Sequence, residues 1–346
     1  MASIGATSVE QALAGGVEFL LAQQGRDGLW RDFETLAGEA SDWPTGFVGA
    51  QLVGAGVHGT PIDRAAEALL RRQHRDGGWG YHHYVPSDAD STAWSLMFLA
   101  ALGLGRNAME QAGRSLQRFQ DPRTGGVSTY ADPGPIRRYL HAGPRLDMRG
   151  WCSCHLEVTA TAGRAFALVP NGRFRQEAEL AWQYVERRQA PDGGWDSYWW
   201  VDRHYPTWQA VAMADALGRP EPVARAAAWA RSEQLSEGAW SATRFARSAF
   251  ATALSLTVRI RAGDPGPQDD TILRGLLELV DLQQPDGSWP GHASMRIPPP
   301  GVAEPESYQS WQVDGLGTGV VLRDHHRLFT TAACVSLLAL AAGAVP

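Results

Sequence analysis

The sequence has little cysteine, no long apolar run and no basic leader. Three cysteines occur in 346 residues, Cys152, Cys154 and Cys334. These are too few for a disulfide framework, so we expect free thiols or site residues. No stretch of about 18 uninterrupted apolar residues occurs, so no transmembrane helix is expected. Residues 1–21 carry two glutamates and no basic segment, which predicts a first helix and not a secretory signal. We therefore expect a cytoplasmic protein.

Clustered positive charge and the common nucleotide motifs are also lacking. The net charge is -6 with a pI near 5.9, which argues against a nucleic-acid partner because phosphate binding needs clustered Lys and Arg. The sequence contains no P-loop, no Gly-x-Gly-x-x-Gly after a strand and no Gly-x-Ser-x-Gly elbow. Nucleotide-dependent and acyl-transfer chemistry therefore have no support.

One short phrase, in contrast, recurs six times. It reads Gln-x-x-Asp/Glu-Gly-x-Trp, and its full copies span residues 24–30, 73–79, 189–195, 234–240 and 283–289. A sixth, degraded copy runs from Gln120 through Gly125 and Gly126 to Val127, where the tryptophan is lost. Such self-similarity at regular spacing is the signature of a repeat architecture.

Each copy follows an amphipathic stretch and precedes a more uniformly apolar one. Val9, Leu13, Val17 and Leu20 form one apolar stripe at helical spacing before the first copy, which predicts an outer helix with one wet face. A helix that is apolar all round is buried on all sides. The predicted inner helices of this kind span 43–57, 92–104, 155–168, 206–217, 245–260 and 328–342. Six inner and six outer helices predict an all-α fold, an (α/α)6 barrel, with residues 1–346 as one domain.

The phrase resembles the QW motif of squalene-hopene cyclases and class II diterpene cyclases. That family shares its barrel with the β subunits of protein prenyltransferases, and the resemblance covers nearly the whole chain. Squalene cyclases and class II diterpene cyclases usually have two such barrels, whereas this chain has the length of one.

Function is expected at the end of the barrel where the inner helices begin, which we call the mouth. Polar and aromatic residues gather at these helix starts, and two long connections, 125–149 and 290–321, are predicted to reach the same end as lids or binding walls. The predicted substrate-contacting residues are Trp43, Trp94, Trp151, Trp199, Trp200, Asp202, Trp208, Arg247, His325 and His326.

The segment Asp88-Ala-Asp90-Ser91-Thr-Ala is similar to the Asp-x-Asp-Asp-Thr-Ala motif of class II cyclases. In that family the middle aspartate donates the proton that starts cyclisation. Asp90 matches the middle aspartate, Asp88 the first, and Ser91 replaces the third. A second interpretation is that Asp90 only caps the inner helix, because Asp before an apolar run is a common N-cap.

The resemblance implies a class II-type terpene cyclase that protonates an alkene or epoxide of an isoprenoid or isoprenoid-bearing substrate. An alkene is a very weak base, so its donor must be a neutral, poorly solvated acid, and a second carboxylate nearby favours that state. Asp90 is the predicted acid and Asp88 its neighbour, while His155 or His204 orients the acid or removes the final proton. Tryptophans shield the carbocation. A membrane surface is a further expected partner at the periphery, and Mg²⁺ would enter only with a diphosphate substrate.

Two other functions remain open from the sequence. The segment 201–210 looks like the zinc-binding Asp-x-Cys segment of prenyltransferase β subunits, with Asp202 and His204 as candidate ligands. The third ligand of that family aligns with Thr330, so we expect no bound metal. The other alternative is a barrel that binds or scaffolds without catalysis, as the degraded third repeat and Ser91 would allow.

Overall fold

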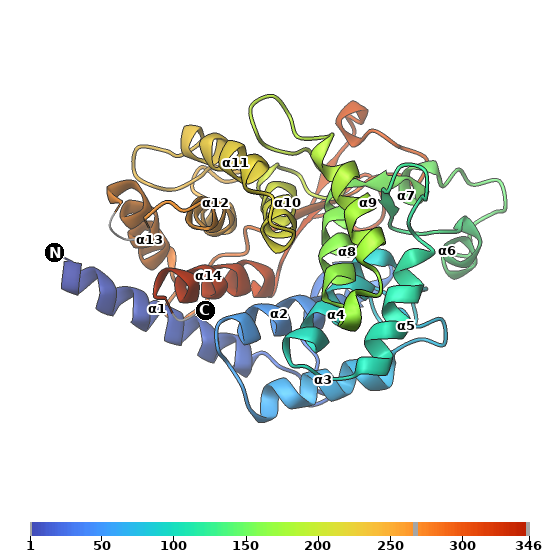
Figure 1. The fold of residues 1–346 in the computed structure, drawn as a ribbon, viewed down its shortest axis with the longest axis horizontal. Helices are drawn as coiled ribbons and strands as arrows, with labels where there is room; N and C mark the ends of the chain where they lie inside the picture. The colour runs from blue at the N-terminus through green and yellow to red at the C-terminus, as the bar shows by residue number, and fades with distance from the viewer. Residues whose placement is uncertain (1, 266–268, 344–346) are drawn as a thin grey trace.

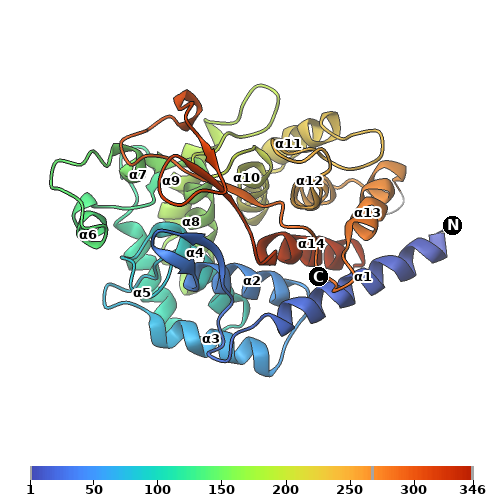
Figure 2. The same ribbon diagram turned by 180° about the vertical axis from the view of Figure 1, so that it is seen from behind.

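The computed structural model describes residues 2–265 and 269–343, and twelve helices in these ranges form two concentric rings (Figures 1 and 2). The inner ring consists of α2 (Asp42–Gly54), α4 (Ala89–Ala101), α8 (Leu156–Leu168), α10 (His204–Ala216), α12 (Ala249–Arg261) and α14 (Leu328–Ala341). The outer ring consists of α1 (Ala2–Ala22), α3 (Thr60–Arg72), α5 (Arg106–Gln117), α9 (Arg175–Glu186), α11 (Pro220–Ser232) and α13 (Asp270–Leu282). Each inner helix contacts the next, and α14 contacts α2. The predicted all-α (α/α)6 barrel is confirmed.

The two rings differ in burial as their sequences predict. In α14 nearly every side chain is buried, whereas in α3 the buried residues lie on one side of the helix and are Ile62, Ala65, Ala66, Ala68 and Leu69. One hydrophobic core runs through all six inner helices. Burying the apolar ring is the main favourable term in folding such a barrel.

The repeated phrase joins three helices at each turn. The glutamine amide donates to the carbonyl of its own turn glycine and to a carbonyl in the first turns of the next outer helix, as Gln73 does to Gly77 (2.8 Å) and Ala108 (2.9 Å). Gln283 makes the corresponding pair of bonds to Gly287 and to Ala12, both at 2.8 Å, although Ala12 lies in the middle of α1. The last repeat is thereby bonded to the first, which closes the outer ring.

The tryptophan and glycine of the phrase have equally specific places. The Trp79 indole donates to the Leu69 carbonyl at 2.8 Å, ten residues back in the outer helix, and its backbone N–H donates to the Thr92 hydroxyl of the inner helix at 3.0 Å. Gly77 has φ +87°, and a Cβ there would lie 2.6 Å from the Gln111 carbonyl oxygen. Only glycine suits both the conformation and the close approach.

The degraded third copy keeps most of this frame. Gln120 donates to the Gly125 and Glu177 carbonyls at 3.1 and 2.9 Å, and the Val127 N–H donates to the Thr159 hydroxyl at 2.8 Å. Because valine replaces the tryptophan, the hydrogen bond from the indole to the outer helix is lost. The repeat therefore survives because most of its bonds are made by glutamine and backbone.

The sequence did not predict the short strands that the structure places between the repeat phrases and the inner helices. They are β1 (Asp32–Thr35) with β2 (Gly38–Ala40), β3 (Val127–Ser128) with β4 (Cys154–His155), and the sheet β5-β7-β6 (Ser294–Ile297, Val320–Arg323, Gln312–Val313). The first two pairs are antiparallel, as is β5 with β7, while β6 runs parallel to β7. Figure 2 shows the orange-to-red segment between α13 and α14 crossing the face of the barrel nearest the viewer.

Four short helices complete the described elements. They are α6 (Pro133–Tyr139), α7 (Arg149–Cys152) and the 3-10 turns η1 (Pro170–Gly172) and η3 (Pro305–Ser307). Among the helices described here, none combines the length and apolarity that a membrane crossing requires.

Candidate active site

A cavity opens at the mouth, above the first turns of α2, α4 and α8. Its lining is mostly aromatic and aliphatic, and the carboxyl groups among the described lining residues are those of Asp88, Asp90 and Glu157. The walls come from the β1–β2 hairpin, the connection around α6 and the β5–β7 segment, so both long connections line the cavity. Their role in binding stays a prediction. The lining residues are Thr35, Leu36, Ala37, Trp43, Tyr81, Val85, Asp88, Asp90, Ser91, Thr129, Tyr130, Ile136, Tyr139, Leu140, Trp151, Glu157, Val158, Trp199, Trp200, Met295, Ile297, Gly317 and Thr318.

Asp88 is the N-cap of α4. Its carboxylate accepts from the Ser91 backbone N–H at 2.8 Å and from the Ser91 hydroxyl at 2.7 Å. Ser91, where the family motif has a third aspartate, thus serves as a hydrogen-bond donor to the first. The interpretation that Asp90 only caps the helix is wrong, because a helix end has one N-cap and Asp88 occupies it.

Asp90 lies two residues beyond the cap, in the first turn of α4 and at the edge of the cavity. Its Oδ2 accepts from the Trp43 indole at 2.8 Å, and its Oδ1 is buried without a hydrogen-bond partner among the described residues. A buried, unpaired oxygen is most costly on an ionised carboxylate. The site therefore favours the neutral acid.

The electrostatic surroundings point the same way for both aspartates. Burial raises the pKa of Asp88 to about 7, against the opposing effect of the Ser91 hydrogen bonds. Burial, and next the charge of Asp88, raise the pKa of Asp90 to about 8, while the neighbouring Thr161 hydroxyl and the Trp43 indole act to lower it. Asp88 consequently ionises first and its charge keeps the proton on Asp90. At neutral pH, Asp90 is a protonated acid at an apolar cavity.

Aromatic rings surround this acid. Trp43 stacks on Tyr81 with ring centroids 6.2 Å apart and lies 6.5 Å from Trp200, and Trp151 lies 5.8 Å from Trp199. All five residues line the cavity. The negative faces of such rings stabilise a cation in a site without water.

Glu157 is a cavity residue that the predicted site did not include. Its carboxylate accepts from the backbone N–H groups of Tyr198 at 3.0 and 3.2 Å and of Trp199 at 2.7 Å. Burial raises its pKa, while these backbone bonds lower it. Glu157 therefore fixes the backbone that carries the Trp199 and Trp200 side chains to the cavity wall.

His155 lies behind that wall and not beside Asp90. Its Nε2 lies 2.8 Å from the Gly150 carbonyl, which can only accept, so Nε2 carries the proton and Nδ1 accepts from the Thr129 hydroxyl at 2.8 Å and the Trp199 indole at 3.2 Å. Burial lowers the pKa of His155 to about 3, which keeps the ring neutral. Within the described chain no hydrogen bond joins His155 to Asp90. Its predicted role in proton transfer stays a prediction.

His204 and Asp202 lie outside the cavity lining. The ring of His204 is held by the Ser255 hydroxyl at 2.9 Å and the Ser241 carbonyl at 3.1 Å, while Asp202 accepts from the His204 backbone N–H at 3.4 Å. Both ring nitrogens are therefore occupied. The described residues offer no third His, Cys, Asp or Glu ligand that would complete a metal site with Asp202 and His204. The interpretation of this segment as a prenyltransferase-like zinc site therefore has no geometric support.

Trp94 and Trp208 lie deeper in the barrel than the mouth. Their rings stack on each other at 6.1 Å, and the Trp94 indole donates to the Tyr205 hydroxyl at 3.2 Å. Neither lines the cavity. They stand in the second turns of α4 and α10, whereas Trp43 is in the first turn of α2 and the other predicted tryptophans precede the inner helices.

Arg247 is held away from the cavity by carboxylates. Its guanidinium contacts Glu278 and lies 3.0 Å from Asp281. His325 and His326 also lie outside the cavity lining and both face Glu39 of the β1–β2 hairpin. Of the residues predicted to contact substrate, the structure thus brings Trp43, Trp151, Trp199 and Trp200 to the cavity.

The cavity-lining residues that the sequence analysis did not predict come mainly from the connections between helices. Tyr81, Tyr130 and Tyr139 share the wall with Leu36 and Ile297. The only available signal was their position between a repeat phrase and the next inner helix. The three cysteines are free, as expected, with Cys334 buried in the core and outside the cavity.

Comparison with known proteins shows the family of this chain. The profile of the squalene-hopene cyclase C-terminal domain matches residues 120–297. Drimenyl diphosphate synthase of Streptomyces showdoensis is 31% identical over 252 residues, which cover 68% of this chain and 42% of that protein. A squalene–hopene cyclase of Bradyrhizobium diazoefficiens is 24% identical, with 64% of this chain and 37% of that protein covered. The chain spans about two-fifths of the length of these curated relatives.

Solved structures match over the whole barrel. A protein from Actinoplanes has a TM-score of 0.87 at 33% identity, covering 97% of this chain and 99% of its own. The type II terpene cyclase MstE from Scytonema, solved as a variant with geranylgeranyl dihydroxybenzoate as substrate, has a TM-score of 0.86 at 27% identity, with 99% of both chains covered. The chain therefore belongs to the squalene-hopene cyclase C-terminal domain family, within the superfamily of class II terpene cyclases.

Proposed function

We propose that this protein cyclises an isoprenoid chain by protonating a terminal alkene or epoxide from Asp90. The observation that carries the proposal is the state of that carboxyl group. It has a pKa raised to about 8, one oxygen bonded to the Trp43 indole and one buried without a partner, at the edge of an aromatic cavity. A neutral acid with this pKa is matched to a proton transfer near neutral pH.

The proposed reaction is an isomerisation of an alkene substrate. Asp90 gives its proton to the less substituted carbon of the terminal alkene, and the π electrons form the new C–H bond and leave a tertiary cation on the other carbon. The next alkene attacks the resulting cation to close each ring, with the charge held over the faces of Trp43, Tyr81 and Trp200. The last cation then loses a proton to a water molecule, and Asp90 regains a proton from solvent, so substrate and product are isomers. Asp88 acts as a positioning and tuning residue, since it caps α4 and its charge raises the pKa of Asp90.

The cavity favours a substrate whose polar end is not a diphosphate. Among the described lining residues there is no Arg, Lys or His. Three arginines near the mouth are each paired with a carboxylate, since Arg203 lies 2.6 Å from Asp192, Arg244 3.3 Å from Asp314 and Arg247 3.0 Å from Asp281. A diphosphate in such a cavity would lack the cations or Mg²⁺ that its charge requires. We therefore propose an isoprenoid with an aromatic or otherwise unphosphorylated head, so Mg²⁺ is not part of the proposal.

The test compares substrates and one variant. Purified protein is incubated with farnesyl diphosphate, geranylgeranyl diphosphate and a geranylgeranyl-substituted dihydroxybenzoate, and products are identified by mass spectrometry as isomers of the substrate. Asp90→Asn should lower turnover by at least about a hundredfold, because an amide does not supply the proton. Asp63→Asn, on the exposed face of α3, is the matched control and should leave turnover unchanged.

Two outcomes would count against the proposal separately. Turnover of Asp90→Asn within a few-fold of wild type would remove Asp90 as the acid. Cyclisation of a diphosphate together with no reaction of the aryl substrate would overturn the assignment of the head group and leave the acid in place.

The substrate's apolar chain is proposed to reach the cavity from a membrane surface. Leu36 is 74% exposed and Leu316 61% exposed, and both belong to segments that line the cavity, with Leu36 itself in the wall. Exposed apolar side chains around an apolar opening suit partial insertion into lipid. Leu36→Glu with Leu316→Glu should reduce co-sedimentation with phospholipid vesicles several-fold. Equal sedimentation of wild type and the double variant would exclude this route.

A further inference from the structure

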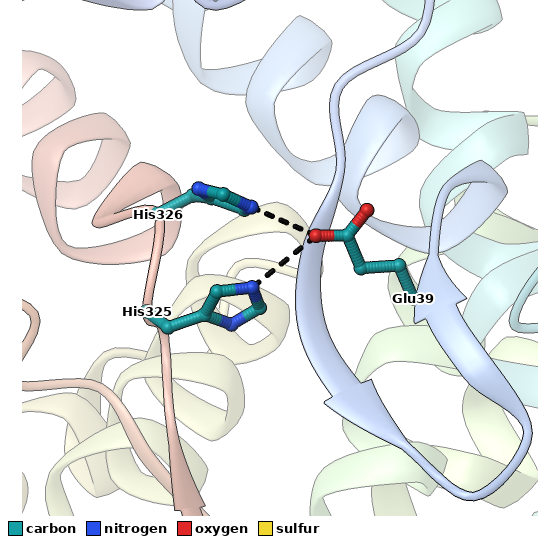
Figure 3. Close-up of side chains that lie close together, drawn as sticks. All are labelled: Glu39, His325 and His326. Carbon is teal, nitrogen blue, oxygen red and sulfur yellow. Dashed lines mark hydrogen bonds and ion pairs between the residues drawn. The ribbon is translucent and has the colours of Figure 1, made fainter.

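Two histidines and one glutamate converge on a point outside the cavity. His325 and His326 stand in the segment just before α14, and Glu39 lies in β2 of the β1–β2 hairpin. Figure 3 shows both imidazole rings turned toward one carboxylate oxygen. His326 Nε2 lies 2.7 Å and His325 Nε2 3.2 Å from Glu39 Oε1. Residues nearly 300 positions apart in the sequence thus present three donor atoms to one point.

The separations of these atoms suit a common metal ion. All three lie within 4.8 Å of one another. Ligands at 2.0–2.1 Å from one tetrahedral zinc stand about 3.3 Å apart. The two Nε2–Oε1 distances, 2.7 and 3.2 Å, are shorter than that value, so small side-chain rotations that move these atoms apart are enough to admit an ion. Side-chain exposures of 33% for Glu39, 36% for His325 and 46% for His326 leave a path for the ion and room for water as a further ligand.

A buried carboxylate lies behind the pair of histidines. Asp32 Oδ1 lies 3.4 Å from His325 Nδ1. Asp32 also accepts from the backbone N–H groups of His326 at 3.1 Å and Leu328 at 2.9 Å. A carboxylate on the far nitrogen of a histidine fixes its ring and directs the other nitrogen outward, which is the usual arrangement behind metal-bound histidines. The backbone bonds hold the whole 325–328 segment in place.

We propose that Glu39, His325 and His326 bind one divalent transition-metal ion, with Zn²⁺ as the expected occupant. Two imidazoles and one carboxylate form a donor set that suits Zn²⁺ and its neighbours in the first transition row, whereas Mg²⁺ and Ca²⁺ take oxygen ligands. Three protein ligands leave a fourth position for water. The proposal differs from our expectation from sequence that no metal is bound, and it uses none of the Asp202–His204 segment.

The ion would fasten one wall of the cavity. Glu39 belongs to the hairpin whose Thr35, Leu36 and Ala37 line the cavity, while the two histidines precede inner helix α14. Without an ion, Glu39 and Asp32 connect the hairpin to this segment by polar contacts, and Phe33 packs on Phe329 of α14 at 5.0 Å. Metal binding adds a cross-link between the hairpin and the barrel frame, so it orders the wall without contacting the acid.

The experiment measures metal binding without substrate, so its outcome is independent of cyclisation. Tag-free protein is treated with a chelator, dialysed, and titrated with ZnCl₂ by calorimetry, and its zinc content is measured after gel filtration. Wild type should bind about one Zn²⁺ per chain, and millimolar Mg²⁺ should not compete. Glu39→Gln and His326→Ala should each weaken binding by at least about tenfold, since one of three ligands is lost. His58→Ala, at an exposed histidine elsewhere, should bind like wild type.

A second readout locates the ion. Zn²⁺ should slow amide hydrogen exchange in residues 32–40 of wild type and leave these amides unchanged in His326→Ala. Circular dichroism confirms that the variants are folded, which is expected at such exposed positions. Absence of stoichiometric Zn²⁺ binding to wild type, or binding of equal strength in Glu39→Gln and His326→Ala, would overturn the proposal.

Discussion

Repeats two and five of the barrel share one frame and differ in what they place on it. In both, the phrase tryptophan donates its backbone N–H to a threonine hydroxyl of the inner helix at 3.0 Å and its indole N–H to the outer helix at 2.8 Å. In both, the N-cap side chain accepts from the backbone N–H three residues on. The corresponding residues are Trp79, Asp88 and Thr92 in repeat two and Trp240, Ser248 and Thr252 in repeat five.

The difference lies two residues after the cap. Repeat two has Asp90 at the cavity, whereas repeat five has Phe250, which is 4% exposed and stacks on Trp200 at 5.5 Å. Capping and acid chemistry therefore belong to separate residues. The frame needs only a cap, so the position beyond it is free to carry an acid in one repeat and an apolar ring in another.

The largest expected effect comes from moving the acid to the other repeat. Phe250→Asp should lower the free energy of unfolding by about 3–5 kcal/mol, the usual cost of losing a buried phenylalanine, with a further cost for a carboxyl group among rings. Urea denaturation measures it. Phe250→Leu, which keeps the position apolar, should lose clearly less. A loss below about 1 kcal/mol in Phe250→Asp would show that both repeats tolerate an acid there, and the comparison would fail.

A smaller effect tests whether the frame itself is shared. Gln73→Leu removes two hydrogen bonds to backbone carbonyls, at Gly77 and Ala108, and should cost about 1–2 kcal/mol. Gln234→Leu removes the matching pair and also the bond from the buried Arg259 guanidinium at 2.8 Å, so it should cost more. Thermal or urea unfolding of both variants gives the values. An equal or reversed order would mean that the Arg259 contact contributes nothing at repeat five.

The frame was predictable from the sequence because its contacts are local or made to backbone. Gln, Gly and Trp at fixed spacing can bond only the helices on either side, so the six copies specify the ring before any long-range contact is known. The observed helix starts differ from the predicted ones by a few residues where the preceding connection has a structure of its own. Residues 245–248, predicted as helix, precede α12 because Ala242 and Phe245 form a β-bridge.

The site was only partly predictable because its walls depend on contacts far along the chain. The Asp90 acid follows from its motif, but Tyr81 and Ile297 meet Trp43 only through the packing of separate connections across the mouth. Arg247 could not be distinguished from a substrate ligand by sequence, since its partners Glu278 and Asp281 lie on the next outer helix. Glu39 and the two histidines are nearly 300 residues apart, which no local pattern connects.

The smallest expected effect on stability comes from giving repeat two the N-cap residue of repeat five. Asp88→Ser keeps a good N-cap, since serine and aspartate cap helices about equally well, so the free energy of unfolding should change by less than about 0.5 kcal/mol. The variant removes the charge that helps raise the pKa of Asp90. That pKa should then fall by about one unit, a typical effect of losing a nearby like charge.

The consequence for activity has a definite sign. The active form of Asp90 is protonated, so the turnover of wild type should be constant at lower pH and fall as the pH rises through about 8. In Asp88→Ser the fall should begin about one pH unit lower, with the plateau little changed, because the acid itself remains. Ser91→Ala removes one donor to Asp88 and keeps its charge, so its descending limb should stay near that of wild type. If Asp88→Ser instead lowers the plateau without moving the limb, Asp88 takes part in the proton transfer directly, and the separation of cap and acid between the two repeats no longer holds.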